Sequence, residues 1–308
     1  MDGARGARRS LVAGGLLLAA MSASALLAPW LATDRPWLAR ERGRLSVLPP
    51  AGAADEPLVR APVPFDPLAV DITRSLEPPS RRHPLGTDAL GRDLLSRMLH
   101  GARRSLAAGL LATALALAVA LFLGAAAGMA PAGLDEALAR VADVVNAFPA
   151  LVGAVALLGG AGGLVAGLAE PVQVAVVVGL FTWPALFRYV RAEVRRVASG
   201  EVALSALAAG AGPARVAARH LLPLALTPVL VPAAFVAGGT VLAEAGLGFL
   251  GLGIRPPEPS WGNLLRDGMA ELRSAWWLTA FPGLAVFATV LAFQLLADGL
   301  RRRAGGPA

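Results

Sequence analysis

Few residues in this chain could do covalent or metal chemistry. There is no cysteine, which excludes disulfides and thiolate zinc sites. The three histidines lie far apart in the sequence: His83, His100 and His220. Asp88, Arg92 and Asp93 lie close together, but no nucleophile and base accompany them. We therefore predict no catalytic residue and no metal site, and interpret these three charges as the cap and ion pairs of a surface helix.

The cationic residues exclude one class of enzyme. All 28 are arginine, and a Walker-type phosphate loop needs a lysine after its glycines. The chain cannot itself be a P-loop ATPase. The net charge is +7, but the arginines flank apolar segments, so membrane orientation explains them better than nucleic-acid binding does.

Composition indicates an all-α polytopic membrane protein. Hydrophobic residues make up 56% of the chain and mean hydropathy is +0.62, whereas soluble domains are about 45–50% apolar. We predict six membrane-spanning helices, at about residues 11–31, 105–129, 144–158, 172–189, 224–243 and 277–296. The first run could be a secretory signal cleaved after Ala25. We favour an uncleaved span, because the apolar run continues past that point.

The segments between the spans also carry predictions. We expect residues 32–84 to be a partly irregular extracytoplasmic loop, residues 90–99 to be an amphipathic interfacial helix ended by Gly101, and residues 135–143 to be a short loop. Gly124 and Gly128 have the spacing that lets helices pack closely. Five prolines are predicted to bend the spans: Pro149, Pro184, Pro228, Pro232 and Pro282.

The loop at residues 188–223 is rich in arginine, so the positive-inside rule places it in the cytoplasm together with both termini. Its middle, residues 202–209, predicts a short apolar helix ended by Gly210, and Pro213 begins a second helix. An apolar helix in a water-facing loop needs another surface to shield it from water. Lipid headgroups or its own bundle could supply it, and so could a docking partner; physical reasoning alone does not choose between these.

Two carboxylates raise the question of an ion pathway. Glu244 and Asp298 are predicted at the ends of their spans, where both can reach water. This weakens a proton-driven secondary transporter, for which a midplane carboxylate and internal repeats would be expected.

Five segments carry a resemblance to a known family. They are residues 82–97 (RHPLGTDALGRDLLSR), 219–223 (RHLLP), 244–253 (EAGLGFLGLG), 256–262 (PPEPSWG) and 275–283 (AWWLTAFPG). Together they resemble the inner-membrane permeases of dipeptide, oligopeptide and nickel ABC importers, in particular the C-type member of the permease pair. The resemblance covers about residues 79–303, and it implies a type I importer permease with six transmembrane helices. Gly248 departs from it, because the family usually has serine there.

The resemblance implies a contact with an ATPase subunit. In the family, a Glu-Ala-Ala-x-x-x-Gly helix docks in a groove of that subunit. Counting back from Pro223 aligns the family glycine with Gly210 and the family glutamate with position 204, which is leucine in this chain. The glutamate is therefore missing, and Glu201, nearly one turn earlier, is a candidate replacement. The coupling residues implied are Leu204, Ser205, Ala206, Leu207, Gly210 and Pro223. The residues implied to face a binding protein are Arg255, Pro256, Pro257, Ser260 and Trp261.

The organisation that follows has four parts: residues 1–31 as tail and first span, 32–84 as loop, 85–303 as permease core, and 304–308 as tail. The expected setting is the bacterial inner membrane. The expected partners are a second permease, ABC ATPases that hold ATP and magnesium, an extracytoplasmic solute-binding protein and membrane lipid, with no cofactor on this chain and no nucleic acid. The cargo would be peptides or a related small solute such as a nickel chelate. A stand-alone secondary transporter or channel is the alternative, and a membrane enzyme ranks last.

Overall fold

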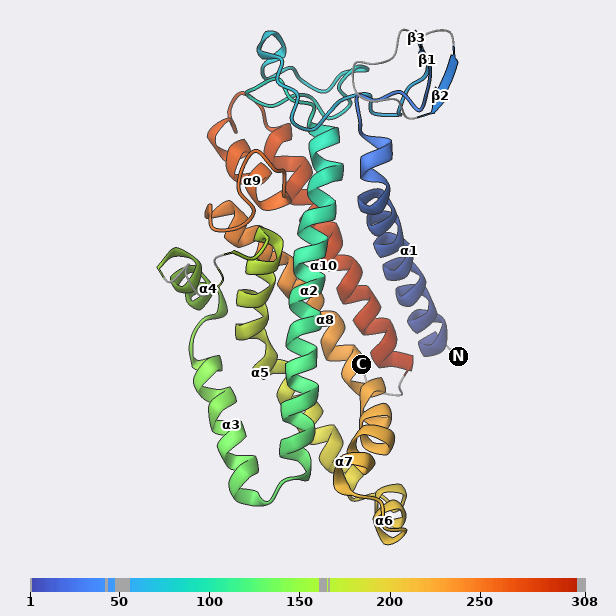
Figure 1. Cartoon of the computed structure of the whole chain (residues 1–308), viewed down its shortest axis with the longest axis vertical. Coiled ribbons are helices and arrows are strands. Elements are labelled where there is room, and N and C mark those ends of the chain that lie inside the picture. The colour runs from blue at the N-terminus through green and yellow to red at the C-terminus, as the bar shows by residue number, and fades with distance from the viewer. Residues whose placement is uncertain (1, 42–43, 48–55, 161–164, 166, 304–308) are drawn as a thin grey trace. The chain divides into compact units, whose positions relative to one another are not determined.

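The structure is a computed structural model that describes residues 2–41, 44–47, 56–160, 165 and 167–303 (Figure 1). The predicted tail at residues 304–308 lies outside this part. The helices are α1 (Asp2–Leu31), α2 (Leu94–Met129), α3 (Ala132–Ala147), α4 (Ala150–Gly159), α5 (Glu170–Ala198), α6 (Glu201–Ala208), α7 (Pro213–Val216), α8 (Leu222–Phe249), α9 (Trp261–Ala270) and α10 (Trp277–Arg303). The chain forms two compact units: unit 1 comprises Met1–Leu17, Ala108–Glu244 and Thr289–Ala308, and unit 2 comprises Leu18–Ala107 and Ala245–Ala288.

The all-α membrane fold is confirmed. Among the described residues, five helices are long and apolar enough to cross a membrane, and α3 with α4 makes a sixth if the pair counts as one span. That pair is bent by 77°. Phe148 is extended (φ −84°, ψ 127°) and Pro149 follows it, because the residue before a proline avoids the helical region. The predicted bend at Pro149 is confirmed, and it breaks the predicted span at residues 144–158 into parts of two helices, whereas Pro184, Pro228, Pro232 and Pro282 lie inside continuous helices.

Unit 1 is built around close packing of α2 on α5. A Cβ added to Gly124 would lie 2.8 Å from the side chain of Val190, and one on Gly128 would lie 2.9 Å from that of Val194. The predicted role of this glycine pair is confirmed, because only glycine allows so close an approach. The core continues through Leu221 and the first turns of α8.

The predicted loop at residues 135–143 is instead the middle of α3. Glu136 pairs with Arg140 on α3 itself, whereas Asp135 and Asp143 have partners far away in sequence, on α5. Arg191 donates from Nη2 to Asp135 at 2.7 Å, Arg195 donates to the same carboxylate, and Arg188 donates to Asp143 at 3.0 Å. These arginines belong to the last turns of α5, so the predicted loop at 188–223 begins in fact only after Ala198.

The predicted interfacial helix at residues 90–99 is also wrong. The helix begins at Leu94, where the Asp93 side chain accepts a hydrogen bond from the backbone N–H of Ser96 at 2.7 Å, and α2 continues without a break through Gly101. In unit 2 a Cβ on Gly101 would lie 3.4 Å from the backbone of Ser260. The glycine therefore serves packing rather than helix termination.

The described part of residues 32–84 is partly irregular, as predicted, and contains three short strands in the order β2-β1-β3. β1 (Leu38–Glu41) pairs antiparallel with β2 (Arg44–Val47) and with β3 (Glu56–Val59).

The two carboxylates have different environments. Glu244 is 0% exposed in α8, so the prediction that it reaches water is wrong. A hydropathy pattern shows where a span ends but not how deeply the fold buries a residue there. Asp298 is partly exposed, as predicted, and it accepts from Arg301 at 3.1 Å and from Arg302 at 2.9 Å.

Candidate functional site

The predicted loop helix exists as α6, in the connection between α5 and α8 (Figure 1). One face of α6 lies on the core of unit 1, because Ala203 is buried and Ala206 is partly buried there. Glu201, Ser205 and Ala208 follow at helical spacing on another face and are exposed. The chain's own bundle thus covers part of α6, and a second face is accessible to a partner.

Gly210 ends α6 by a Schellman motif. Its φ is +82°, and the N–H of Ala211 donates to the carbonyl of Ala206 at 3.0 Å. The left-handed conformation costs glycine nothing, whereas other residues pay for it. A Cβ at Gly210 would meet no heavy atom within 4 Å, so the requirement comes from the backbone and not from crowding.

The chain re-enters the bundle through α7, which begins at Pro213 as predicted. A π-helical segment, Ala217–Leu221, then leads into α8. Pro223 is exposed in the first turn of α8. It has no N–H to donate to the carbonyl of Arg219, four residues earlier, and Arg219 lies within the π-helical segment.

The implied coupling residues therefore have different environments. Ser205 and Gly210 are exposed, while Ala206 packs partly on the chain's own core. The side chains of Leu204 and Leu207 lie outside the described part of the structure. Contact of this region with an ATPase stays a prediction.

Two of the segments that carry the resemblance meet in unit 2. Leu94, from residues 82–97, shares a core with Ala275, Trp277 and Leu278, from residues 275–283, and Leu264 of α9 joins it. The indole N–H of Trp277 donates to the carbonyl of Thr87 at 3.2 Å. The segments thus fold as one body although almost 200 residues separate the first from the last.

The start of α9 explains the run PPEPSWG. Ser260 and Asn263 form a capping box, in which each side chain accepts from the other's backbone N–H. Trp261 is 2% exposed, and its indole N–H donates to the carbonyl of Met98 at 3.3 Å. Ser260 and Trp261 are therefore buried within this chain, whereas Arg255, Pro256 and Pro257 are exposed and able to meet another protein.

Glycines of two segments touch through their backbones. A Cβ on Gly248 would lie 3.0 Å from Cα of Gly262, and one on Gly253 would lie 2.7 Å from Cα of Gly248. This close approach gives a physical reason for glycine at position 248, where the family usually has serine.

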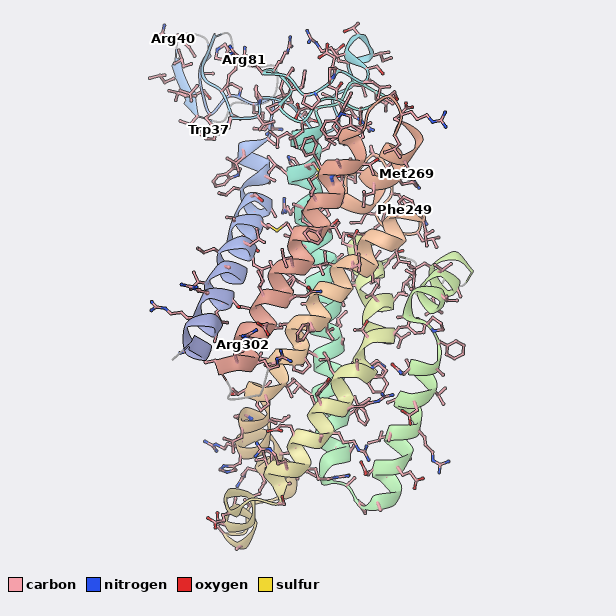
Figure 2. All side chains as sticks on the ribbon, turned by 180° about the vertical axis from the view of Figure 1, so that it is seen from behind. Trp37, Arg40, Arg81, Phe249, Met269 and Arg302 are labelled. Atoms are coloured by element: carbon pink, nitrogen blue, oxygen red, sulfur yellow. The ribbon has the colours of Figure 1, made fainter. Side chains whose placement is uncertain are left out.

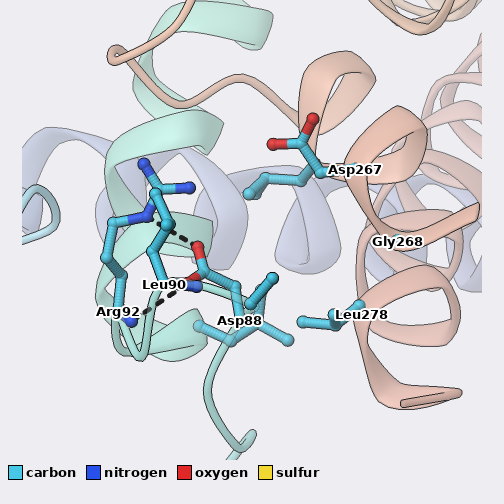
Figure 3. A pocket seen from close by; sticks show the side chains of 9 residues that line it. Asp88, Leu90, Arg92, Asp267, Gly268 and Leu278 are labelled. Atoms are coloured by element: carbon cyan, nitrogen blue, oxygen red, sulfur yellow. Dashed lines mark hydrogen bonds and ion pairs between the residues drawn. The ribbon is translucent and has the colours of Figure 1, made fainter. Parts of the chain in front are cut away.

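A cavity of about 220 Å³ lies where these segments meet (Figure 3). Asp88 and Arg92 form one wall: Asp88 accepts from Arg92 Nε at 2.7 Å and from the N–H of Leu90 at 2.9 Å. Asp267 comes from α9, and Leu278 from the start of α10. Asp88 also pairs with the buried Arg97 at 3.4 Å, so these contacts hold the loop at residues 88–92 in place. The predicted ion pair is confirmed, although Asp88 is buried and the segment is a loop, not a helix.

A model of the family described as binding-protein-dependent transport system inner membrane component matches residues 101–306. This chain belongs to that family. It is the permease subunit of an ABC importer in the inner membrane, which matches the expected type of protein. Permeases of this family work with ATPase subunits and a second permease.

Several relatives are similar over most of their length. The chain is 38% identical to the di/tripeptide transport system permease DppC of Pseudomonas aeruginosa, covering 77% of this chain and 78% of the relative. It is 38% identical to the glutathione transport system permease GsiD of Pectobacterium atrosepticum, covering 75% of both chains. A putative peptide transport permease of Brucella suis is 34% identical over 96% of this permease and 86% of its own length.

The fold is that of a solved importer. An inward-facing structure of the MetNI methionine ABC transporter matches with a TM-score of 0.55, covering 70% of this permease and 98% of that chain at 17% identity. At this identity the match shows the fold alone, and it agrees with the expected type I architecture.

Sequence reasoning missed the ion pairs between α3 and α5. Asp135 is 7% exposed and accepts hydrogen bonds from both Arg191 and Arg195. A signal was present, because the arginines at 188, 191 and 195 recur at helical spacing and so share one face of a continuing helix.

Proposed function

We propose that this permease imports peptides or a related small solute by alternating access, driven by ATP that partner subunits hydrolyse. The observation that carries the proposal is α6, which joins α5 to α8 and has one face on the core and one face exposed. A force on the exposed face would reach both spans through Ala203 and Ala206. The cargo follows from the relatives, which are named for di/tripeptides and glutathione.

The full assembly we propose contains a second permease, ATPase subunits that hold ATP and magnesium, and an extracytoplasmic solute-binding protein, all in membrane lipid. Arg255, Pro256 and Pro257 would contact the binding protein through their exposed surface. The excess of arginine after Arg188 supports a cytoplasmic position for α6 and for both termini.

The absence of cysteine from the whole chain makes a direct test simple. Ser205→Cys places one thiol on the exposed face of α6, and Ser46→Cys places one on β2, in the proposed extracytoplasmic loop. In membranes of known orientation, a membrane-impermeant maleimide should label the first thiol only from the cytoplasmic side and the second only from the other. A bifunctional maleimide should cross-link the first thiol to a P-loop ATPase.

Purification of the tagged permease from native membranes tests the rest of the assembly. We expect a second permease, P-loop ATPases and a solute-binding protein to be recovered. Recovery of this chain alone, under conditions that preserve a control importer, would instead favour a self-sufficient secondary transporter.

A further inference from the structure

An open hollow of about 690 Å³ lies on α1 within unit 1. Its lining residues share one face of the helix and combine two cations with an apolar wall: Arg8, Arg9, Val12, Ala13 and Leu16. They follow at steps of one, three or four residues, which places them side by side along the helix. The hollow therefore has a charged end and an apolar end.

The neighbouring face of α1 is already occupied by α10. A Cβ on Gly14 would lie 2.7 Å from the carbonyl oxygen of Ala292, and one on Gly299 would lie 2.8 Å from the backbone nitrogen of Leu11. Figure 2 shows α1 beside the end of α10 that carries Arg302. The hollow is thus not the seam between these helices, and the described part of this chain leaves it open.

The apolar end of the hollow needs a cover that water cannot supply. Val12 is 51% exposed and Leu16 is 66% exposed. The apolar part of α1 has a hydropathy of 2.1 with only 17% of it buried, the lowest share among the five candidate spans of the described residues. In a membrane, acyl chains cover such a face.

The charged end identifies the headgroup. Arg301 and Arg302 both pair with Asp298, whereas Arg8 and Arg9 are exposed and have no ion pair among the described residues. A guanidinium forms paired hydrogen bonds with phosphate oxygens, and two adjacent ones attract a headgroup of net negative charge over a zwitterionic one. A protein partner would have to bury these two charges against carboxylates of its own.

We propose that this hollow binds an anionic phospholipid, with its phosphate on Arg8 and Arg9 and an acyl chain along Val12 and Leu16. The site requires only that α1 lies in a bilayer, so it does not depend on the cargo or on the ATPase contact. A lipid bound there would stabilise the packing of α1 on α10 in the assembled importer.

The test uses the whole importer, delipidated in detergent and titrated with phosphatidylglycerol or phosphatidylcholine, with bound lipid counted by native mass spectrometry. We expect wild type to prefer phosphatidylglycerol, and Arg8→Gln/Arg9→Gln to weaken that binding about 30-fold, since each arginine near an anionic lipid surface contributes about a five-fold factor. The matched control is Arg35→Gln/Arg273→Gln, which removes the same charge from exposed positions in unit 2 and should leave binding unchanged.

A second variant separates lipid from free phosphate. Leu16→Trp keeps both arginines but fills the apolar end, so it should also weaken phosphatidylglycerol binding, while competition by inorganic phosphate should be negligible. Equal binding of the two lipids, equal losses in the test and control pairs, or no lipid retained by the wild-type importer would overturn the proposal. The last result would mean that another subunit covers the hollow.

Discussion

Substitutions of Gly210, at the end of α6, test whether this position needs glycine because of its backbone conformation or because of crowding by a side chain. Gly210 has φ +82°, and a Cβ there would meet nothing within 4 Å. Alanine in a left-handed conformation costs about 1–2 kcal/mol, whereas asparagine adopts it more readily, and a β-branched valine is the least tolerant. Asparagine is also larger than alanine. If crowding mattered, alanine would be tolerated better than asparagine; if the left-handed conformation matters, asparagine is tolerated better than alanine.

A cost of about 1–2 kcal/mol lowers the population of the native turn relative to other conformations by about 5- to 30-fold. If the turn positions α6 for the ATPase, Gly210→Ala should lower uptake by up to that factor. Gly210→Asn should retain most uptake, and Gly210→Val should abolish it while the protein still inserts into the membrane.

The assay is ATP-dependent uptake of a labelled dipeptide into proteoliposomes that contain the whole importer. Gly212→Ser is the matched control, because Gly212 lies in the same connection, has open space around it and shows no left-handed φ. Its uptake should stay within about two-fold of wild type. Wild-type uptake by the alanine and valine variants would refute the coupling role, and equal losses for asparagine and valine would refute the conformational reason.

Three further predictions concern stability, measured by thermal unfolding in detergent. Gly124→Ala should lower the free energy of unfolding by about 1–3 kcal/mol, because its Cβ would meet α5. Gly133→Ala, where a Cβ would meet no atom within 4 Å, should raise it by up to about 1 kcal/mol. Equal effects of the two variants would contradict the packing of α2 on α5. Asp135→Asn should cost about 1.5–3 kcal/mol through the loss of charge-assisted bonds to α5, and an unchanged melting temperature would count against them. Ser260→Ala should cost about 1 kcal/mol through the lost cap of α9, and Ser260→Thr should restore most of it; failure of threonine to rescue would argue against capping.

The features predicted correctly from sequence depend on local chemistry. The helix at residues 202–209, its end at Gly210 and the next start at Pro213 each follow from the preferences of one or two residues. The glycine pair of α2 also worked, because its spacing alone places both residues on one face.

The errors came from partners that are distant in sequence. Gly101 appeared to be a helix end, but α2 passes through it, and the missing side chain makes room for the backbone of Ser260. Asp135 appeared to belong to a loop because Arg191 and Arg195, which neutralise it, come 56 and 60 residues later. Glu244 appeared to be water-accessible because hydropathy shows where a span ends but not how deeply the fold buries a residue there. The family resemblance supplied the permease assignment, which these local patterns could not give.

The central claim is that this permease works in an importer driven by ATP. The most direct measurement reconstitutes it with its second permease, ATPases and binding protein, and follows labelled dipeptide uptake with ATP on the ATPase side. We predict that uptake needs ATP and the binding protein, and that it persists when ionophores collapse all ion gradients. Uptake by this chain alone that follows an ion gradient and ignores ATP would contradict the account.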